Sequence, residues 1–291
     1  MRTEQEMYDL IVGTAKADER IRAVYMNGSR TNPNVPKDIF QDYDVVYVVT
    51  ETKPFYEDKN WIDVFGERLY MQCPDELDKS VGMEVDFDKS YGWLIQLADG
   101  NRIDLHVEPV ADCNITDDKL CKILLDKDGI LPTIPEPTDE DYRIKKPTAE
   151  EFYAACNEFW WCLNNVAKGL WREEVPYVLD MINHCVRPQI VKILSWKIGF
   201  DTDFTVCAGK SAKYMYKWLE PAVWQRFLAT YSGADISAVW DSVFAMCGLM
   251  DEFAPEIAEK LCTEYDFTMA KNSRLWLEKV QKLPKNAKEI I

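Results

Sequence analysis

The segment from residue 26 to residue 49 constrains the fold of this chain more than any other. An apolar strand ends in the turn Gly28-Ser29-Arg30, and a second apolar strand opens with Asp42-Tyr43-Asp44. Residues two apart on a strand project from the same face, so Asp42 and Asp44 bring two carboxylates together. Like charges this close are costly unless a cation shares them. Mg²⁺ suits such oxygen ligands, so the segment predicts a magnesium site at the start of the second strand.

The turn before the acid pair has the chemistry of a phosphate site. Gly28 allows the backbone to approach a ligand closely. Backbone N–H groups, the Ser29 hydroxyl and the Arg30 guanidinium can all donate hydrogen bonds to phosphate oxygens. A Gly-Ser pair alone is usually just a turn, and an Asp-x-Asp alone can be a solvated strand edge. Their combination in one segment indicates a site for a nucleoside triphosphate and its metal.

A third acid follows on a predicted β-hairpin between residues 91 and 110, with its turn at Asp99-Gly100. On the returning strand Asp104, His106 and Glu108 share one face, because side chains alternate along a strand. Asp104 can ligate a metal, accept the proton of an attacking hydroxyl, or do both. Glu108 is the alternative base, and a packed or surface role is the simpler interpretation of His106.

The pattern changes from mixed to helical near residue 147, and it predicts an α+β chain of two domains, 1–147 and 148–291. In the first domain we expect helix, strand, helix and strand in that order, then a mixed β-sheet flanked by helices. A proline-rich stretch leads into the second domain, which we predict to be a helical bundle. The predicted segments are a helix from Thr3 to Ala17, a strand at 21–26, helical spacing at 61–71, a short helix or strand at 119–125, and helices beginning at Thr148 and covering 175–197 and 236–253.

Composition narrows the classes of partner. The net charge is −16 over 291 residues, which argues against a nucleic-acid surface, because such a surface needs concentrated positive charge. A polycationic small molecule fits better. Nine cysteines without a Cys-x-x-Cys pair, and only two histidines, predict free thiols in a reducing cytosol rather than a zinc site. The N-terminal residues lack a secretory pattern, and no apolar run is long enough to cross a membrane, so we expect a cytoplasmic protein.

The turn, the acid pair and Asp104 together resemble the nucleotidyltransferase signature of the DNA polymerase β-like superfamily. Longer segments resemble the aminoglycoside 6-adenylyltransferases, which modify streptomycin, and this similarity extends over nearly the whole chain. The segments that carry it are Gly28-Ser29-Arg30-Thr31-Asn32, Pro36 to Asp44, Asn157-Glu158-Phe159-Trp160 and Ser195-Trp196-Lys197-Ile198-Gly199.

The resemblance implies a nucleotidyltransferase domain at 1–147, a helical domain at 148–291, ATP as co-substrate and Mg²⁺ as cofactor. It implies transfer of AMP to the 6-hydroxyl of streptomycin with release of pyrophosphate, by a monomer or weak dimer. Three groups of residues receive roles: Asp42, Asp44 and Asp104 for metal and catalysis; Gly28, Ser29, Arg30, Lys210 and Lys213 for the nucleotide; and Glu158, Trp160 and Asp180 for the drug. The acids of the last group suit the guanidinium and amine groups of such a drug.

Two other classes of function stay open at this point. One is a nucleotidyltransferase of the same fold that acts on RNA or on a protein, which would need a basic groove or a docking face. The other is a non-catalytic nucleotide-binding partner protein. Retention of all three acids, Asp42, Asp44 and Asp104, argues against the second class.

Overall fold

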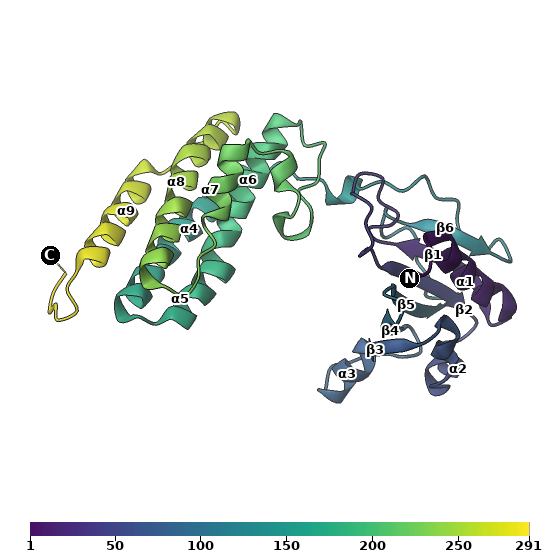
Figure 1. Cartoon of the computed structure of the whole chain (residues 1–291). Coiled ribbons are helices and arrows are strands. Elements are labelled where there is room, and N and C mark those ends of the chain that lie inside the picture. Colours follow the sequence, from purple (N-terminus) through teal and green to yellow (C-terminus); the bar gives the residue numbers. More distant parts are fainter. Residues whose placement is uncertain (291) are drawn as a thin grey trace. The chain divides into compact units, whose positions relative to one another are not determined.

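The chain folds into two compact units, shown by a computed structural model that describes residues 1–290 (Figure 1). The first unit is Met1–Asp141 and the second is Tyr142–Ile291, so the division falls just before the boundary predicted at residue 147. Ile291, the last residue of the predicted second domain, lies outside the described residues. Each unit has a hydrophobic core of its own.

Unit 1 is built on a mixed sheet of six strands in the order β3-β4-β5-β2-β1-β6. The pairing between β2 and β5 is parallel, and the other four pairings are antiparallel. The strands are β1 (Ile21–Asn27), β2 (Tyr43–Val49), β3 (Arg68–Gln72), β4 (Tyr91–Leu97), β5 (Arg102–Pro109) and β6 (Lys122–Asp126). The predicted mixed sheet and the hairpin at residues 91–110 are therefore confirmed.

The two faces of this sheet are covered differently. On one face Val45 and Tyr47 pack with Met7 and Ile11 of helix α1 (Glu4–Ala17) in the main core of the unit. On the other face a smaller apolar cluster covers part of β1 and β2, and its buried members are Ala23, Tyr25, Val46, Val48, Ile115 and Cys121. Because side chains alternate along a strand, Asp44 shares this second face with Val46. The central strands thus carry a polar end beside a small core.

The remaining elements of unit 1 correct two predictions. Residues 28–42, all of which the structure describes, form turns and contain no helix, whereas we predicted one between β1 and β2. Pro33 and Pro36 explain this, since each lacks an N–H donor and restricts the residue before it. The helical spacing at 61–71 is broken at Gly66, whose φ of 105° ends a 3₁₀ turn before β3 begins. The remaining elements of unit 1 are α2 (Lys53–Glu57), η1 (Trp61–Phe65) and α3 (Pro74–Ser80), and η2 (Glu140–Tyr142) spans the division between the units.

Unit 2 is the predicted helical bundle. The capping box at Thr148 and Glu151 opens its first long helix, as the box at Thr3 and Glu6 opens α1. The predicted helix 236–253 continues through Pro255 to Lys260. The helical elements are α4 (Ala149–Arg172), α5 (Val175–Met181), η3 (Ile182–Val186), α6 (Arg187–Asp201), η4 (Lys210–Ala212), η5 (Met215–Lys217), α7 (Pro221–Leu228), α8 (Ile236–Lys260) and α9 (Phe267–Lys282). None of the helices described is both long and apolar enough to span a membrane.

The predicted helix 175–197 contains a wide π turn, η3, between α5 and α6. Pro188 lies just after this turn. In a regular α-helix the residue at this position donates its N–H to the carbonyl of His184. Proline has no N–H to donate, and its ring would collide with that carbonyl. The wide turn accommodates the proline without ending the helix, so the chain continues through α6 to Asp201.

Candidate active site on the polar face of the sheet

The structure brings Asp42, Asp44 and Asp104 together on one face of the unit 1 sheet. Asp44 of β2 lies directly opposite Asp104 of β5 in the parallel pairing, and directly opposite Asn27 of β1 in the antiparallel pairing. Asp42 precedes β2 by one residue. One carboxylate oxygen from each of the three acids lies within 4.8 Å of the others. Strand register, rather than a flexible loop, therefore sets the position of two of the three carboxylates.

Gly28 places the turn backbone against this cluster. Its φ is 77°, a conformation that favours glycine, and a Cβ added here would lie 2.0 Å from Oδ2 of Asp44. The Gly28 carbonyl accepts hydrogen bonds from the Thr31 N–H at 3.2 Å and from the Thr31 hydroxyl at 2.9 Å. The turn thus has a shape that favours glycine, with its backbone next to the acids.

Gln41 connects the turn to the acid pair. Its Nε2 donates to the Ser29 carbonyl at 3.2 Å and lies 3.5 Å from the Ser29 hydroxyl. Its Oε1 and the Oδ1 of Asn27 are buried, and neither has a hydrogen-bond partner among residues 1–290. Buried acceptors without a donor are costly. Metal-bound water or ligand donors would satisfy them, so this end of the sheet fits a hydrated cation and a polar ligand.

The electrostatics of the cluster also favour a cation. Burial, followed by the negative charges of Asp42 and Asp104, raises the pKa of Asp44 to about 7. Arg102 supplies compensating charge: its Nε and Nη2 donate to the two carboxylate oxygens of Asp104 at 2.8 and 2.6 Å, and its Nε lies 3.7 Å from Asp42. One guanidinium does not balance three carboxylates. The oxygen donor set and the residual negative charge fit Mg²⁺.

Arg102 was not identified from the sequence, although a signal was available. It lies two residues before Asp104 on the same strand, so both side chains share a face. That alternation would have placed a cation beside the third acid.

Arg30 contacts the segment that leads into β2. Its Nε donates to the Asp42 carbonyl at 3.0 Å and its Nη2 to the Gln41 carbonyl at 2.7 Å. Its guanidinium also lies 3.7 Å from the centre of the Tyr43 ring and 3.3 Å from Glu4, and the side chain is 8% exposed. These contacts hold the segment before β2 in place. They assign Arg30 a positioning role, and its contact with phosphate stays a prediction.

Trp160, predicted to line the drug site, is a core residue of unit 2. It is 2% exposed, and its indole N–H donates to the Tyr265 hydroxyl at 2.9 Å. Its neighbour Trp161 is 63% exposed. Adjacent helix positions face in different directions. Trp160 lies four residues after Cys156 and three before Leu163, both buried, so the apolar periodicity of α4 favours Trp160 as the core residue.

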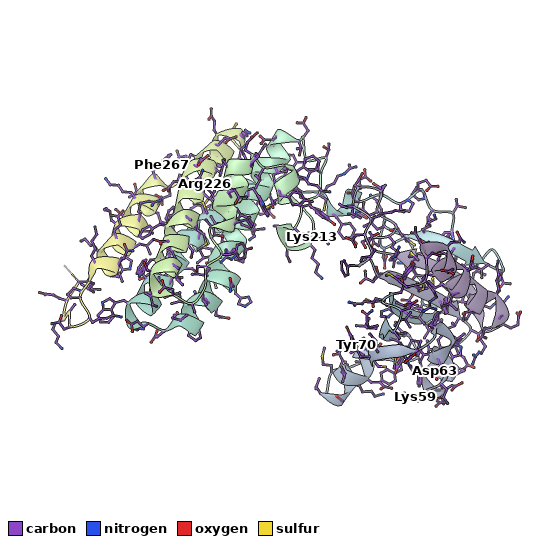
Figure 2. The ribbon with its side chains drawn as sticks, in the orientation of Figure 1. Lys59, Asp63, Tyr70, Lys213, Arg226 and Phe267 are labelled. Atoms are coloured by element: carbon purple, nitrogen blue, oxygen red, sulfur yellow. The ribbon has the colours of Figure 1, made fainter. Side chains whose placement is uncertain are left out.

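The other predicted residues of unit 2 are exposed. Glu158 on α4 accepts a hydrogen bond from the Cys162 thiol at 3.2 Å, and Asp180 on α5 lies 3.5 Å from His184. Lys210 and Lys213 lie at the ends of the short η4 turn, and Figure 2 labels Lys213. Exposed acids and lysines of this kind are free to bind a ligand of opposite charge.

Replacing Gly28 by alanine tests the contact between the turn and Asp44. We expect Gly28→Ala to lower the free energy of unfolding by roughly 2 to 5 kcal/mol, combining the cost of positive φ with that of overpacking. Gly82→Ala is the matched control, because Gly82 has a φ of 89° but no atom within 4 Å of the position that a Cβ would take. Urea denaturation of both variants measures the difference. Equal losses in the two variants would show that Gly28 does not press against Asp44.

Replacing Asp44 by asparagine tests the charge repulsion. The folded-state pKa of Asp44, about 7, lies above its ordinary value of 3.8, so the folded protein binds this proton more tightly than the unfolded chain. Its contribution to stability is therefore lost as the pH rises from about 4 to 7. Each pKa unit corresponds to about 1.4 kcal/mol, which bounds the loss at roughly 4 kcal/mol. We expect metal-free Asp44→Asn to unfold like wild type near pH 4 and to be more stable at pH 8.

Urea denaturation at several pH values, with and without Mg²⁺, measures this difference. Added Mg²⁺ should stabilise wild type more than Asp44→Asn, since the cation offsets the repulsion among the carboxylates. Identical stability of the two proteins at pH 8 without metal would contradict the raised pKa of Asp44.

This chain is similar to several known proteins. The family model for streptomycin adenylyltransferase matches residues 1–280. An aminoglycoside 6-adenylyltransferase of Campylobacter jejuni is 39% identical over 267 residues, which is 91% of each chain. One from Bacillus subtilis (strain 168) is 37% identical over 268 residues, covering 91% of this chain and 93% of that one. A crystal structure of an aminoglycoside 6-adenyltransferase from Bacillus subtilis covers 97% of this chain at 31% identity, with a TM-score of 0.48.

The relatives cover 91% of the chain, and the family model spans residues 1–280, a range that includes the positions of all three acids and most of both units. On that basis the chain belongs to the streptomycin adenylyltransferase family, and it is an adenylyltransferase.

Proposed function

We propose that this protein transfers AMP from ATP to a hydroxyl of an aminoglycoside, with the 6-hydroxyl of streptomycin as the acceptor, and releases pyrophosphate. The observation that carries the proposal is the cluster of Asp42, Asp44 and Asp104, whose oxygens lie within 4.8 Å of one another beside a glycine turn. The names of the relatives support an aminoglycoside as substrate.

The residues of the cluster and its turn divide the work of this reaction. Mg²⁺ would be held by Asp42, Asp44 and Asp104. When bound, it would stabilise the negative charge of the triphosphate and the charge that develops on it during transfer. The backbone of Gly28 and the hydroxyl of Ser29 would bind phosphate oxygens. Asp104 would accept the proton of the drug hydroxyl as that hydroxyl attacks the α-phosphorus. Arg102 fixes the orientation of Asp104 through two hydrogen bonds.

The helical unit would supply the contacts to the charged ends of the substrates. Lys210 and Lys213 are candidates for the triphosphate, because exposed lysines bind phosphate as point charges. Glu158 and Asp180 are candidates for the guanidinium groups of streptomycin, which carboxylates bind with two parallel hydrogen bonds. The acidic balance of the chain suits a cationic drug better than a nucleic acid.

Pyrophosphate release tests the proposal directly. Purified protein is incubated with ATP and Mg²⁺ and with streptomycin, a pool of RNA, or no acceptor. Pyrophosphate is measured in each case, and the mass of the drug is determined by mass spectrometry. We expect release only with streptomycin, together with a gain of one AMP by the drug. Pyrophosphate release that depends on RNA would overturn the proposed substrate. No pyrophosphate release with any acceptor would overturn the proposed reaction.

The roles within the cluster are separated by three substitutions. We expect Asp42→Asn and Asp44→Asn to abolish transfer and to weaken MgATP binding, because each removes a metal ligand. We expect Asp104→Asn to lower kcat by roughly 10²-fold or more, as loss of a general base does. Turnover and calorimetric titration of MgATP measure these effects. If Asp104→Asn also loses MgATP binding, Asp104 is chiefly a metal ligand and another residue is the base.

The drug contact is tested at Asp180. Removing one charge-assisted partner costs roughly 1.5 to 3 kcal/mol, so Asp180→Asn should raise the Kd for streptomycin about tenfold or more while MgATP binding stays unchanged. Asp241→Asn, which removes an exposed acid of α8, is the matched control. Calorimetry with both ligands distinguishes the variants. Equal streptomycin affinity for wild type and Asp180→Asn would place the drug site elsewhere.

A further inference from the structure

A second cluster of possible metal ligands lies in the helical unit, apart from the acids of unit 1. It consists of Glu158 and Cys162 of α4 and Cys185 of η3. One carboxylate oxygen and the two sulfur atoms all lie within 4.8 Å of one another, and Cys162 Sγ is 3.2 Å from Oε1 of Glu158. The reaction of the unit 1 cluster makes no use of either thiol.

Helix geometry accounts for this grouping. Glu158 and Cys162 are four residues apart on α4, so their side chains are neighbours on one face. Cys185 belongs to the π turn that packs against α4, next to Val186, which is fully buried. Such wide turns are frequent at functional sites. Two separate elements thus contribute to one group of ligands.

The spacing of the three atoms is close to that of a tetrahedral site. Zinc to sulfur and zinc to oxygen bonds of about 2.3 and 2.1 Å place two tetrahedral ligands roughly 3.6 to 3.8 Å apart. The three atoms lie within 4.8 Å of one another, so small side-chain adjustments suffice to reach this spacing. Exposure increases from Cys162 through Cys185 to Glu158, so solvent and an entering ion reach the group from the carboxylate side.

We propose that Glu158, Cys162 and Cys185 form a binding site for a thiophilic divalent cation of the Zn²⁺ class, with water as the fourth ligand. Sulfur ligands select such cations, whereas Mg²⁺ prefers oxygen, so this site is chemically distinct from the carboxylate cluster. On binding, two metal–sulfur bonds replace two sulfur–hydrogen bonds, and both protons pass to solvent. The bound cation links α4 to the π turn and thereby stabilises the helical unit.

This site was not predicted from the sequence. Zinc sites are identified from pairs of ligands at short spacing, and here the two cysteines lie on different helical elements at residues 162 and 185. The absence of a Cys-x-x-Cys motif led us to predict free thiols only. The fold supplies the proximity that the spacing does not.

Cobalt titration tests the proposal through its spectrum. The full chain, reduced and freed of metal, is titrated with Co²⁺, which occupies zinc sites and gives a thiolate-to-metal charge-transfer absorption. We expect this absorption to saturate at one Co²⁺ per chain and to disappear when Zn²⁺ is added. We expect Zn²⁺ also to raise the melting temperature, because it binds the folded state.

Three variants locate the site. Cys185→Ser and Cys162→Ser should each remove the charge-transfer absorption or weaken Co²⁺ binding at least tenfold. Two variants are used because Cys162 is buried and its replacement can disturb folding, whereas Cys185 is only partly buried. Cys262→Ser is the matched control, since Cys262 is an exposed thiol of the same unit, and it should bind like wild type.

Glu158 is also a candidate contact for the drug, so a cation bound there would compete with a guanidinium group for that carboxylate. The cobalt titration uses neither drug nor ATP, so its result does not depend on the proposed adenylyl transfer. Absence of a thiolate-to-cobalt absorption in wild type, or its persistence in Cys185→Ser, would overturn the proposal. The cysteine variants leave Glu158 in place as well as the carboxylates of unit 1. The metal site can therefore fail while streptomycin-dependent pyrophosphate release is observed, and the reverse also holds.

Discussion

Repulsion among three carboxylates at the end of β2 and β5 is the constraint to which the surrounding structure responds. Asp44 and Asp104 are held opposite each other by the register of two central strands, so they cannot move apart without breaking the sheet. The Arg102 guanidinium reduces the repulsion among the carboxylates, and the negative charge that it does not compensate can be offset by a cation. Charge that destabilises the metal-free protein is the same charge that would bind a metal and a triphosphate.

The rest of unit 1 gives this cluster a rigid base. The main core packs α1 under the opposite face of the sheet, and Arg30 fixes the segment that enters β2. Gly28 lies so close to Asp44 that the turn and the acid cannot move independently. Such preorganisation matters for phosphoryl transfer, because the protein contributes mainly by positioning and by electrostatic stabilisation.

Much of this architecture could be predicted from the sequence, because it depends on local patterns. Capping boxes located the starts of α1 and α4, and alternation located β4, β5 and the face of Asp104. The errors concern tertiary contacts. The carbonyl contacts of Arg30 could not be predicted, because they depend on the path of the segment that leads into β2. Trp160 lies four residues after Cys156 and three before Leu163, so the apolar periodicity already favoured the core for it, whereas its hydrogen bond to Tyr265 could not be predicted. The cysteine group depends on two helical elements that meet only in the folded unit.

The parallel pairing of β2 with β5 has a consequence for how the chain acquires its activity. Parallel neighbours require a long crossover, and here α2, β3, α3 and β4 must form between the two strands that carry Asp44 and Asp104. Non-local pairing of this kind is slow because loop entropy is lost before contacts are gained. Unit 2, with its sequential helices, has no such requirement. During folding the acid cluster is therefore assembled from distant segments. A cation present at that stage would favour the pairing of β2 with β5, because it offsets the repulsion between the acids that the pairing brings together.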